Sequence, residues 1–138
     1  NKKVLIFGMP NLWRDNDTNQ VKSIIDNKDA LMATGLDAIH IVSPFETYTL
    51  AAYEAQTLSH FQYISDANLD FTESLGVKTK FTEQSSSGKG ETCWRYAILV
   101  ENKVITRIWQ EDGYASTTSY PAVVNTNPTT ILSDLQSA

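Results

Sequence analysis

The chain has 138 residues, 41% of them hydrophobic and 20% charged, a composition typical of one compact domain with its own core. Its net charge of −5 argues against a nucleic-acid-binding surface, and no apolar stretch approaches the roughly 18–20 residues that a membrane span requires. The single cysteine, Cys93, excludes an internal disulfide and a cysteine-rich metal site.

The first residue, Asn1, lies almost directly before the first predicted strand. We therefore expect a single domain over residues 1–138 that lacks its N-terminal lead-in, and any targeting signal would lie in that missing segment. Without a membrane span we expect a soluble protein. The cytoplasm and an organelle lumen both stay open as its compartment.

Three short apolar runs in the first half of the chain predict buried β-strands. They cover residues 4–7, 38–42 and 61–64. The first helix is predicted to begin with Asp17 as its N-cap and Gln20 as the capping-box partner, and to end at Gly35. The next is predicted to begin in the segment 43–46, Ser-Pro-Phe-Glu, and to run to about Leu58. This alternation implies parallel strands joined by right-handed crossovers.

The second half of the chain predicts different elements. They are a short helix from Asp66 to Gly76, a polar loop over residues 82–90, an antiparallel hairpin of residues 95–100 and 104–109, and a helix that opens at Asn127-Pro128. Parallel βαβ units followed by a hairpin and a terminal helix indicate the α/β class. The specific expectation is a thioredoxin-like fold, with a central mixed sheet flanked by helices.

Four stretches of the chain carry a resemblance to a known family. They are residues 4–10 (VLIFGMP), 38–43 (AIHIVS), 63–72 (YISDANLDFT) and 95–101 (RYAILVE). Through them the chain from Lys3 to about Gly113 resembles the peroxiredoxin-5 type of thiol peroxidase, in the redoxin superfamily. The resemblance implies the peroxiredoxin type of thioredoxin-like fold.

The resemblance also implies a site on a short motif after the first strand: a proline, three residues, a threonine or serine, two residues and a cysteine. Counted from Pro10, Arg14 holds the hydroxyl position and Asp17 holds the cysteine position. In the family, the helix start around the cysteine favours its thiolate, and a distant arginine just before the strand at residues 95–100 assists. The alignment puts that arginine position at Thr92, so only the proline remains.

A carboxylate at the cysteine position cannot perform the family's chemistry. That chemistry is thiolate attack on the O–O bond, which leaves a sulfenic acid for a second thiol to reduce. We therefore predict a pseudoenzyme without peroxidase activity by the family mechanism. Two interpretations of Asp17 stay open: a plain helix N-cap beside a solvated Arg14, or a pair of the two residues that forms an altered pocket for a small polar or anionic ligand.

Cys93 offers an alternative in which the chain is still an enzyme. The alignment places it near the rim of the family's site, where Arg14 or Arg95 could lower its pKa. The chain would then be a thiol peroxidase or a thiol-disulfide oxidoreductase with Cys93 as the nucleophile of a relocated site. A thiol from another molecule would have to resolve the sulfenate. The competing interpretation is a small, partly buried residue without chemistry.

Three aromatic residues are candidates for a partner surface. Trp13 lies in the altered loop, while Phe45 and Tyr48 begin the second predicted helix. In related proteins both regions meet a partner subunit across a homodimer interface. Core packing explains Tyr53 and is the alternative for Tyr48, whereas a tryptophan in a polar loop is better explained by a partner.

Metal and cofactor sites are not expected. His40 lies in a predicted strand and His60 at a helix end, with no cysteine or carboxylate at ligand spacing. Gly8 alone follows the first strand, which disfavours a nucleotide-binding loop.

Three functions remain as hypotheses. The leading one is a non-catalytic peroxiredoxin homologue that acts by binding, as a homodimer or with another redox protein. The runner-up is a thiol-dependent enzyme that uses Cys93. The third is a stable remnant whose role lies in residues upstream of Asn1.

Overall fold

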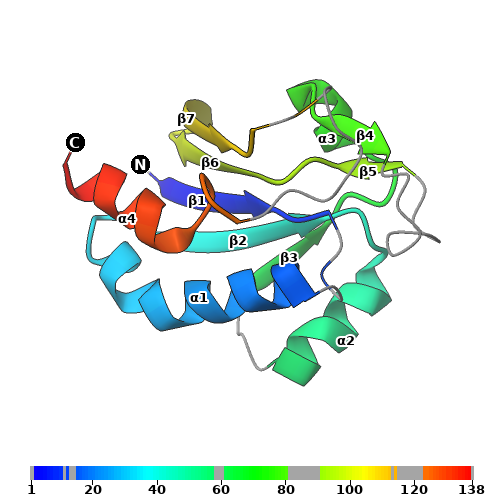
Figure 1. Ribbon diagram of the computed structural model, residues 1–138, viewed down its shortest axis with the longest axis horizontal. Helices are drawn as coiled ribbons and strands as arrows, with labels where there is room; N and C mark the ends of the chain where they lie inside the picture. The colour runs from blue at the N-terminus through cyan, green and yellow to red at the C-terminus, as the bar shows by residue number, and fades with distance from the viewer. Residues whose placement is uncertain are drawn as a thin grey trace.

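The structure, a computed structural model, describes residues 2–10, 12, 15–57, 61–80, 91–112, 114 and 123–137 (Figure 1). The elements follow one another as β1 (Lys3–Gly8), α1 (Asp15–Met32), β2 (Ala38–Ser43), α2 (Thr47–Thr57), β3 (Gln62–Ser65), α3 (Asp70–Leu75), β4 (Lys78–Lys80), β5 (Glu91–Cys93), β6 (Tyr96–Glu101), β7 (Val104–Gln110) and α4 (Pro128–Gln136). This order confirms the predicted βαβαβ first half and the hairpin and helix that follow.

The main sheet is mixed, as expected for a thioredoxin-like fold. Its strand order is β3-β2-β1-β6-β7, with β1–β2 and β2–β3 parallel and β1–β6 and β6–β7 antiparallel. The hairpin turn at Asn102 and Lys103 has positive φ at both residues, the conformation that matches the twist of two adjoining strands.

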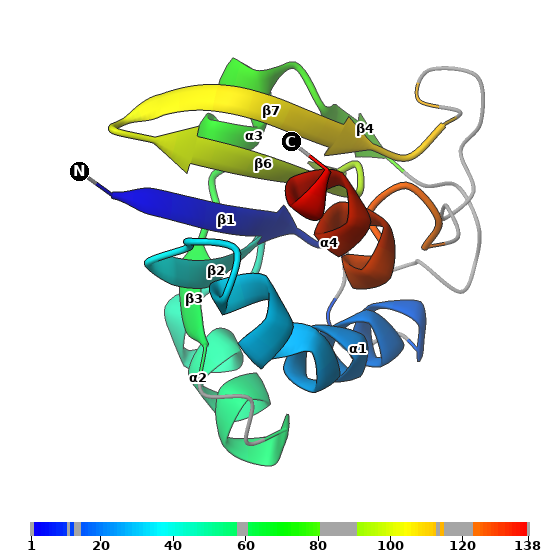
Figure 2. The ribbon, with the colours of Figure 1, turned by 90° about the vertical axis from the view of Figure 1, so that its left-hand side faces the viewer.

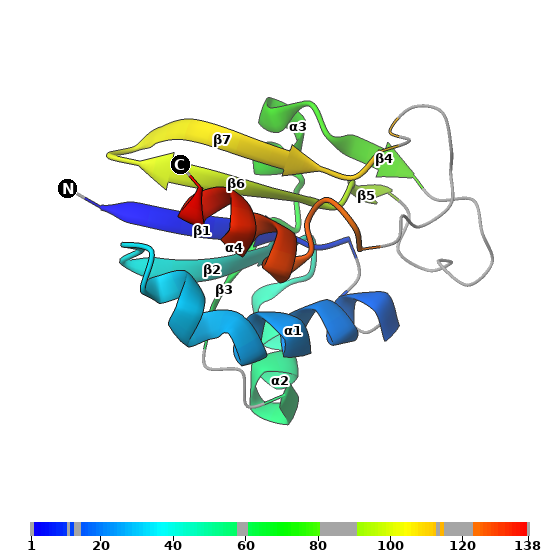
Figure 3. The ribbon, with the colours of Figure 1, turned by 60° about the vertical axis from the view of Figure 1, so that its left-hand side comes forward.

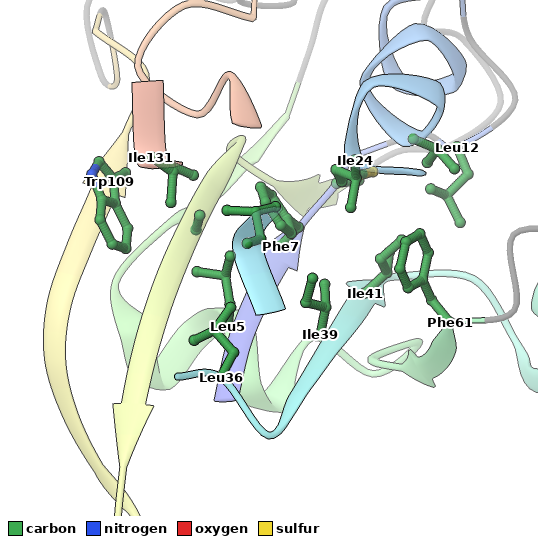
Figure 4. Packing of buried hydrophobic residues seen from close by; sticks show 14 of the residues in the cluster. Leu5, Phe7, Leu12, Ile24, Leu36, Ile39, Ile41, Phe61, Trp109 and Ile131 are labelled. Carbon is green, nitrogen blue, oxygen red and sulfur yellow. The ribbon is translucent and has the colours of Figure 1, made fainter. Parts of the chain in front are cut away.

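Each face of the sheet packs against its own hydrophobic cluster. Figures 2 and 3 show α1 and α4 on one face, while α3 lies on the other. Leu5 and Phe7 of β1 pack toward α1 and α4, together with Ile24 and Ile131 of those helices, as the close-up shows (Figure 4). Alternate residues of β6 point the other way: Ile98 packs with α3 and with the small β4–β5 sheet.

The start of α1 differs from the prediction. The helix begins at Asp15, so Asp17 is its third residue and lies inside the first turn, not at the N-cap. Gln20 does not close a capping box either, because its side chain binds Arg95 and Thr126. The predicted stop is confirmed: α1 ends at Met32, and Gly35 follows with a φ of 108°.

The second helix also begins later than predicted. Ser43 remains in β2, where it pairs with Ser65, and its hydroxyl donates to the Met9 carbonyl at 2.9 Å. The helix begins at Thr47, and Glu46 Oε1 accepts the N–H of Thr49 at 2.9 Å. The predicted capping segment does lie at a helix start. Its acceptor is Glu46, because Ser43 is part of β2 and pairs there with Ser65.

The predicted start of the short helix is four residues too early, whereas the predicted start of the last helix is confirmed. The helix α3 begins at Asp70, directly after Leu69, and Asp66 contacts its first turn from outside the helix. The Asp66 carboxylate accepts the N–H groups of Phe71 and Thr72 at 3.0 and 2.9 Å, at the start of the short α3, and Gly76 ends that helix with a φ of 75°. Asn127 caps α4 by accepting the N–H of Thr129 at 3.0 Å.

The β4–β5 pair was not predicted. Its three residue pairs join Lys78–Lys80 to Glu91–Cys93, and the predicted loop over residues 82–90 lies outside the described residues. Such short strands leave no readable alternation in the sequence. In the part of the chain that the structure describes, no helix has the length and apolar character needed to cross a membrane.

Candidate functional site

The end of β1 and the start of β6 lie side by side, because the strands pair antiparallel with Gly8 opposite Tyr96. Arg95, directly before β6, therefore lies next to the segment that leads from β1 into α1. Its Nη2 forms an ion pair with Oδ1 of Asp17, and both side chains are 0% exposed. The carboxylate also lies in the first turn of α1, where the helix dipole favours negative charge. The site is thus a buried, charge-neutral pair.

Arg95 is also the first member of a longer buried hydrogen-bond network. Its Nη1 donates to Gln20 Oε1 at 2.7 Å, and Gln20 Nε2 donates to the carbonyl oxygen and Oγ1 of Thr126 at 3.1 and 3.2 Å. Thr126 Oγ1 in turn donates to Glu111 Oε2 at 2.6 Å. The same carboxylate accepts the backbone N–H groups of Val124, Asn125 and Thr126. The network links α1 to the segment that precedes α4.

Thr92 stands at the position where the resemblance predicts the family's arginine. It is buried in β5, and its Oγ1 donates to the Pro10 carbonyl at 2.9 Å. The cation that meets Asp17 is Arg95, which the sequence reasoning considered only as a neighbour of Cys93. A signal was present: an arginine directly before a buried strand needs a buried counter-charge, and Asp17 supplies it.

The two interpretations of Asp17 have different outcomes. The plain N-cap is wrong, because the carboxylate is inside the helix turn and paired with Arg95. The proposed pairing of Asp17 with Arg14 concerns a residue outside the described part of the chain, as does the predicted partner residue Trp13. The ligand pocket of that hypothesis therefore stays a prediction.

Cys93 lies in the second hydrophobic cluster and is buried. Burial, and then the negative charge of Asp17, raise the pKa of its thiol, and the lowering effect of Arg95 offsets only part of this. A reactive cysteine needs the opposite shift, because the thiolate is the nucleophile. The environment of Cys93 therefore keeps the thiol neutral and away from solvent.

The aromatic candidates separate into core and surface residues. Tyr53 is buried, its hydroxyl lies 3.1 Å from Thr18 Oγ1, and burial raises its pKa to about 12. Phe45 is partly buried against the main core. Tyr48 is 83% exposed, so core packing does not explain it, and among the aromatic candidates in the described residues it is the exposed one.

No group of three or more histidine, cysteine or carboxylate side chains comes together as a metal site in the described residues. His40 is half-buried, and burial lowers the pKa of its imidazole. His60 lies outside the described part of the chain.

Comparison with known proteins places these features in a family. The sequence model of the redoxin family matches residues 1–124. The hybrid peroxiredoxin hyPrx5 of Haemophilus influenzae is 26% identical over 113 residues, which are 80% of this chain and 46% of that protein. Peroxiredoxin-2E-2 of rice, described as chloroplastic, is 30% identical over 122 residues, 86% of this chain and 54% of that protein. The chain thus spans about half the length of these two relatives.

Solved structures share the fold along nearly the whole chain. Reduced Prx3 from Vibrio vulnificus is 27% identical with a TM-score of 0.82, and the match covers 98% of this chain and 81% of that one. The Plasmodium falciparum antioxidant protein, a 1-Cys peroxiredoxin, has a TM-score of 0.88 at 20% identity, over 100% of this chain and 80% of that one. From the family match, the relatives and the shared fold together, we conclude that this chain belongs to the redoxin family and is related to the peroxiredoxins.

Proposed function

We propose that this chain is a peroxiredoxin homologue without thiol-peroxidase activity and that it acts through binding. One observation carries the proposal: the carboxylate of Asp17, the residue that we predict at the position of the family's nucleophilic cysteine, is buried in an ion pair with Arg95. A carboxylate forms no sulfenic acid that a thiol could reduce, so the family's cycle has no first step here.

Arg95 fills the role that the resemblance gives to the distant arginine, which precedes this strand in the family. In an active enzyme that cation stabilises a thiolate. Here the Asp17 carboxylate already neutralises it, and Gln20 accepts a further N–H of the guanidinium. The site therefore keeps a negative group beside the arginine, as in the family, but without the sulfur. This supports a structural role for the ion pair in place of a catalytic one.

The runner-up enzyme based on Cys93 has less support. Its sulfur would have to attack the O–O bond as a thiolate, and burial raises the pKa of that thiol. It is also the only cysteine in the sequence, so resolution of a sulfenate would need an outside thiol.

Intact-mass measurement after brief exposure to hydrogen peroxide tests the loss of activity. We expect the wild-type mass to stay unchanged over minutes, as that of Cys93→Ser should. Rapid gain of one oxygen in the wild type, absent in Cys93→Ser and reversed by a thiol, would contradict the proposal and favour the runner-up.

A reverting variant is the positive control. Arg14→Thr with Asp17→Cys, in the Cys93→Ser background, restores the family's hydroxyl and sulfur beside Arg95. We expect this variant to gain one oxygen that a thiol removes, because a thiolate would replace the carboxylate as the partner of the guanidinium. If it did not react, position 17 would not be the family's cysteine position.

For the binding role we propose a homodimer, with another redox protein as the alternative partner, and we propose Tyr48 with the nearby Phe45 as the contact residues among those that the structure describes. The 83% exposure of Tyr48 supports this, since tyrosine gives a large contact area at low entropic cost. Phe45, two residues before the start of α2, packs against the main hydrophobic cluster.

A further inference from the structure

The face of the main sheet that carries the second hydrophobic cluster is covered over only part of its area. Phe71 and Leu75 of α3 pack there against the cluster that contains Ile98 of β6. Figures 1 and 3 show the turn of the β6–β7 hairpin at the opposite end from α3. On β7, Ile105 is 40% exposed and Ile108 61%. Exposed apolar residues on a sheet face are typical of a surface that packs against a further layer.

A bulge in the hairpin turns both isoleucines to this face. Ile108 lies opposite Ile98, and Ile105 lies opposite Val100. Opposing residues share a face, and Ile98 belongs to the second cluster while Val100 packs against it. Residues three positions apart would point to opposite faces of a regular strand, and the register shift beside Val100 removes that alternation.

The apolar surface continues across the neighbouring strand β1. Leu5 and Phe7 belong to the main core on the other face of the sheet, so Val4 and Ile6 point to the same face as the two isoleucines. Val4, Ile6 and Val100 are half-buried. We call this surface the open patch; it consists of Val4, Ile6, Val100, Ile105 and Ile108.

One end of the open patch is basic. Lys2 directly precedes β1, and its N–H donates to Asn102 Oδ1 in the hairpin turn at 3.1 Å, which brings Lys2 close to Lys103. Both lysines are exposed. His40 lies opposite Ile6 and shares its face. Burial lowers the pKa of His40, and the positive charge of Lys2 lowers it further, so the charge of Lys2 acts on this side of the sheet.

The dimensions of this face suit a helix better than a second copy of the chain. The sheet has five strands about 4.8 Å apart, so it is about 19 Å across, the length of a helix of about 13 residues. With about two residues per strand beyond the reach of α3, the flat area is roughly 270 Å². That is about a third of the roughly 800 Å² that each partner buries in a stable protein–protein interface.

We propose that the open patch binds an amphipathic helix of another protein, whose acidic end lies beside Lys2 and Lys103. Such a helix would continue the layer that α3 begins on the same face. Its apolar stripe would cover Ile105 and Ile108, and its carboxylates would fix its direction. This surface rests on the proposed role in binding, but on neither the homodimer nor the contact at Tyr48.

A synthetic peptide tests the open patch. The probe is a fluorescent amphipathic helix of about 14 residues, with a stripe of leucines and with glutamates in its first turn. We expect it to bind the wild type at micromolar concentrations in an anisotropy titration, and Ile108→Ser to weaken binding about tenfold or more, because its side chain lies in the apolar contact.

The matched control is Ile25→Ser, since Ile25 is an isoleucine of α1 that is 36% exposed outside the open patch. It should bind the peptide like the wild type, and circular dichroism checks that both variants are folded. No binding to the wild type, equal weakening by Ile25→Ser and Ile108→Ser, or equal binding of a peptide with the same residues in scrambled order would each overturn the open patch as a helix site.

Charge reversal tests the chemistry of the partner. At low salt, Lys2→Glu should weaken the acidic peptide about threefold or more and strengthen a peptide with lysines in place of the glutamates. Lys22→Glu, at an exposed lysine of α1, is the matched control and should change neither affinity by as much. If the wild type bound both peptides equally, the preference for an acidic helix would be wrong.

Two other occupants have their own measurements. Binding of the wild type, but not of Ile108→Ser, to phosphatidylserine-containing vesicles in place of the peptide would assign the open patch to a membrane surface and overturn the proposal. A dimer in sedimentation that the peptide cannot dissociate and that Ile108→Ser abolishes would assign it to a second copy. Failure of the open patch would leave the peroxide experiment and the contact at Tyr48 with their own results.

Discussion

Asp17 and Arg95 form an ion pair in which both side chains are fully buried. Each charge is fully buried, which is costly for an isolated ion, and each is compensated by the other. Gln20 adds a hydrogen bond to the cation, and the first turn of α1 surrounds the anion. Because each partner depends on the other, removal of one charge should be far more harmful than the net contribution of the pair suggests.

At this scale we predict a large loss of stability in Asp17→Asn. The variant leaves the Arg95 guanidinium buried without its counter-charge, and such losses are about 3–5 kcal/mol. Urea unfolding at neutral pH measures it. Asp26→Asn is the matched control, since Asp26 is an exposed residue of the same helix, and its change should stay within about 0.5 kcal/mol. Equal losses in the two variants would show that Arg95 does not need Asp17.

At the scale of elements, pairing between strands decides where helices begin. The Ser-Pro-Phe-Glu segment has the residues of a helix start, yet Ser43 is held in β2 by its pairing with Ser65. The helix therefore begins after Glu46, which provides the acceptor for Thr49. The short strand β5 likewise depends on its neighbours, and its Cys93 is enclosed by β6 and α3 residues of the second cluster.

The burial of Cys93 in β5 predicts a loss of stability at alkaline pH. Its pKa is raised in the folded state, so the folded protein keeps the proton after the unfolded chain has released it. Stability should therefore be constant below the ordinary thiol pKa and fall above about pH 9, by up to about 1.4 kcal/mol per pH unit for this group.

Urea unfolding between pH 7 and about pH 10 measures this decline, to which Tyr53, whose pKa is raised to about 12, adds near the upper end of the range. Cys93→Ala serves as the control, because alanine removes the titrating thiol and should flatten the decline. Parallel curves for the two proteins would mean that Cys93 ionises equally in both states, against the burial described here.

At the scale of the whole molecule, one buried polar network joins segments that are distant in the sequence. It runs from the start of α1 through Arg95 and Gln20 to Thr126, and ends on the Glu111 carboxylate after β7. Trp94 Nε1 also donates to the Glu111 carbonyl at 2.7 Å. The network thus attaches the segment before α4 to the sheet.

We predict that Glu111→Ala loosens this attachment. The N–H groups of residues 124–126 and the Thr126 hydroxyl would lose their acceptor, and the two donors of Thr126 are buried. We expect a loss of about 3 kcal/mol and faster amide exchange at these residues than in β1. Glu101→Ala, which removes a surface ion pair with Lys3, is the comparison and should lose less than about 1 kcal/mol. Unchanged exchange at residues 124–126 in Glu111→Ala would show that other contacts hold the segment.

Much of the fold was predictable because its signals are local. Apolar runs, helix stops at Gly35 and Gly76 and the cap at Asn127 are read within a few residues, and the structure confirms them. The family could be predicted because four stretches of this chain resemble those of the family and occur in the same order. The prediction that Asp17 occupies the position of the family's motif cysteine also uses the sequence alone, because Asp17 is counted from Pro10.

The partner of Asp17 was decided only by tertiary structure. Antiparallel pairing of β1 with β6 brings Arg95 next to the start of α1, and no local pattern in the sequence encodes which strands become neighbours. The burial of Cys93 arises in the same way. The sequence by itself determined the order of the elements, and it carries the prediction that Asp17 stands at the family's cysteine position. Packing between distant segments decided what that residue meets and which surfaces remain for a partner.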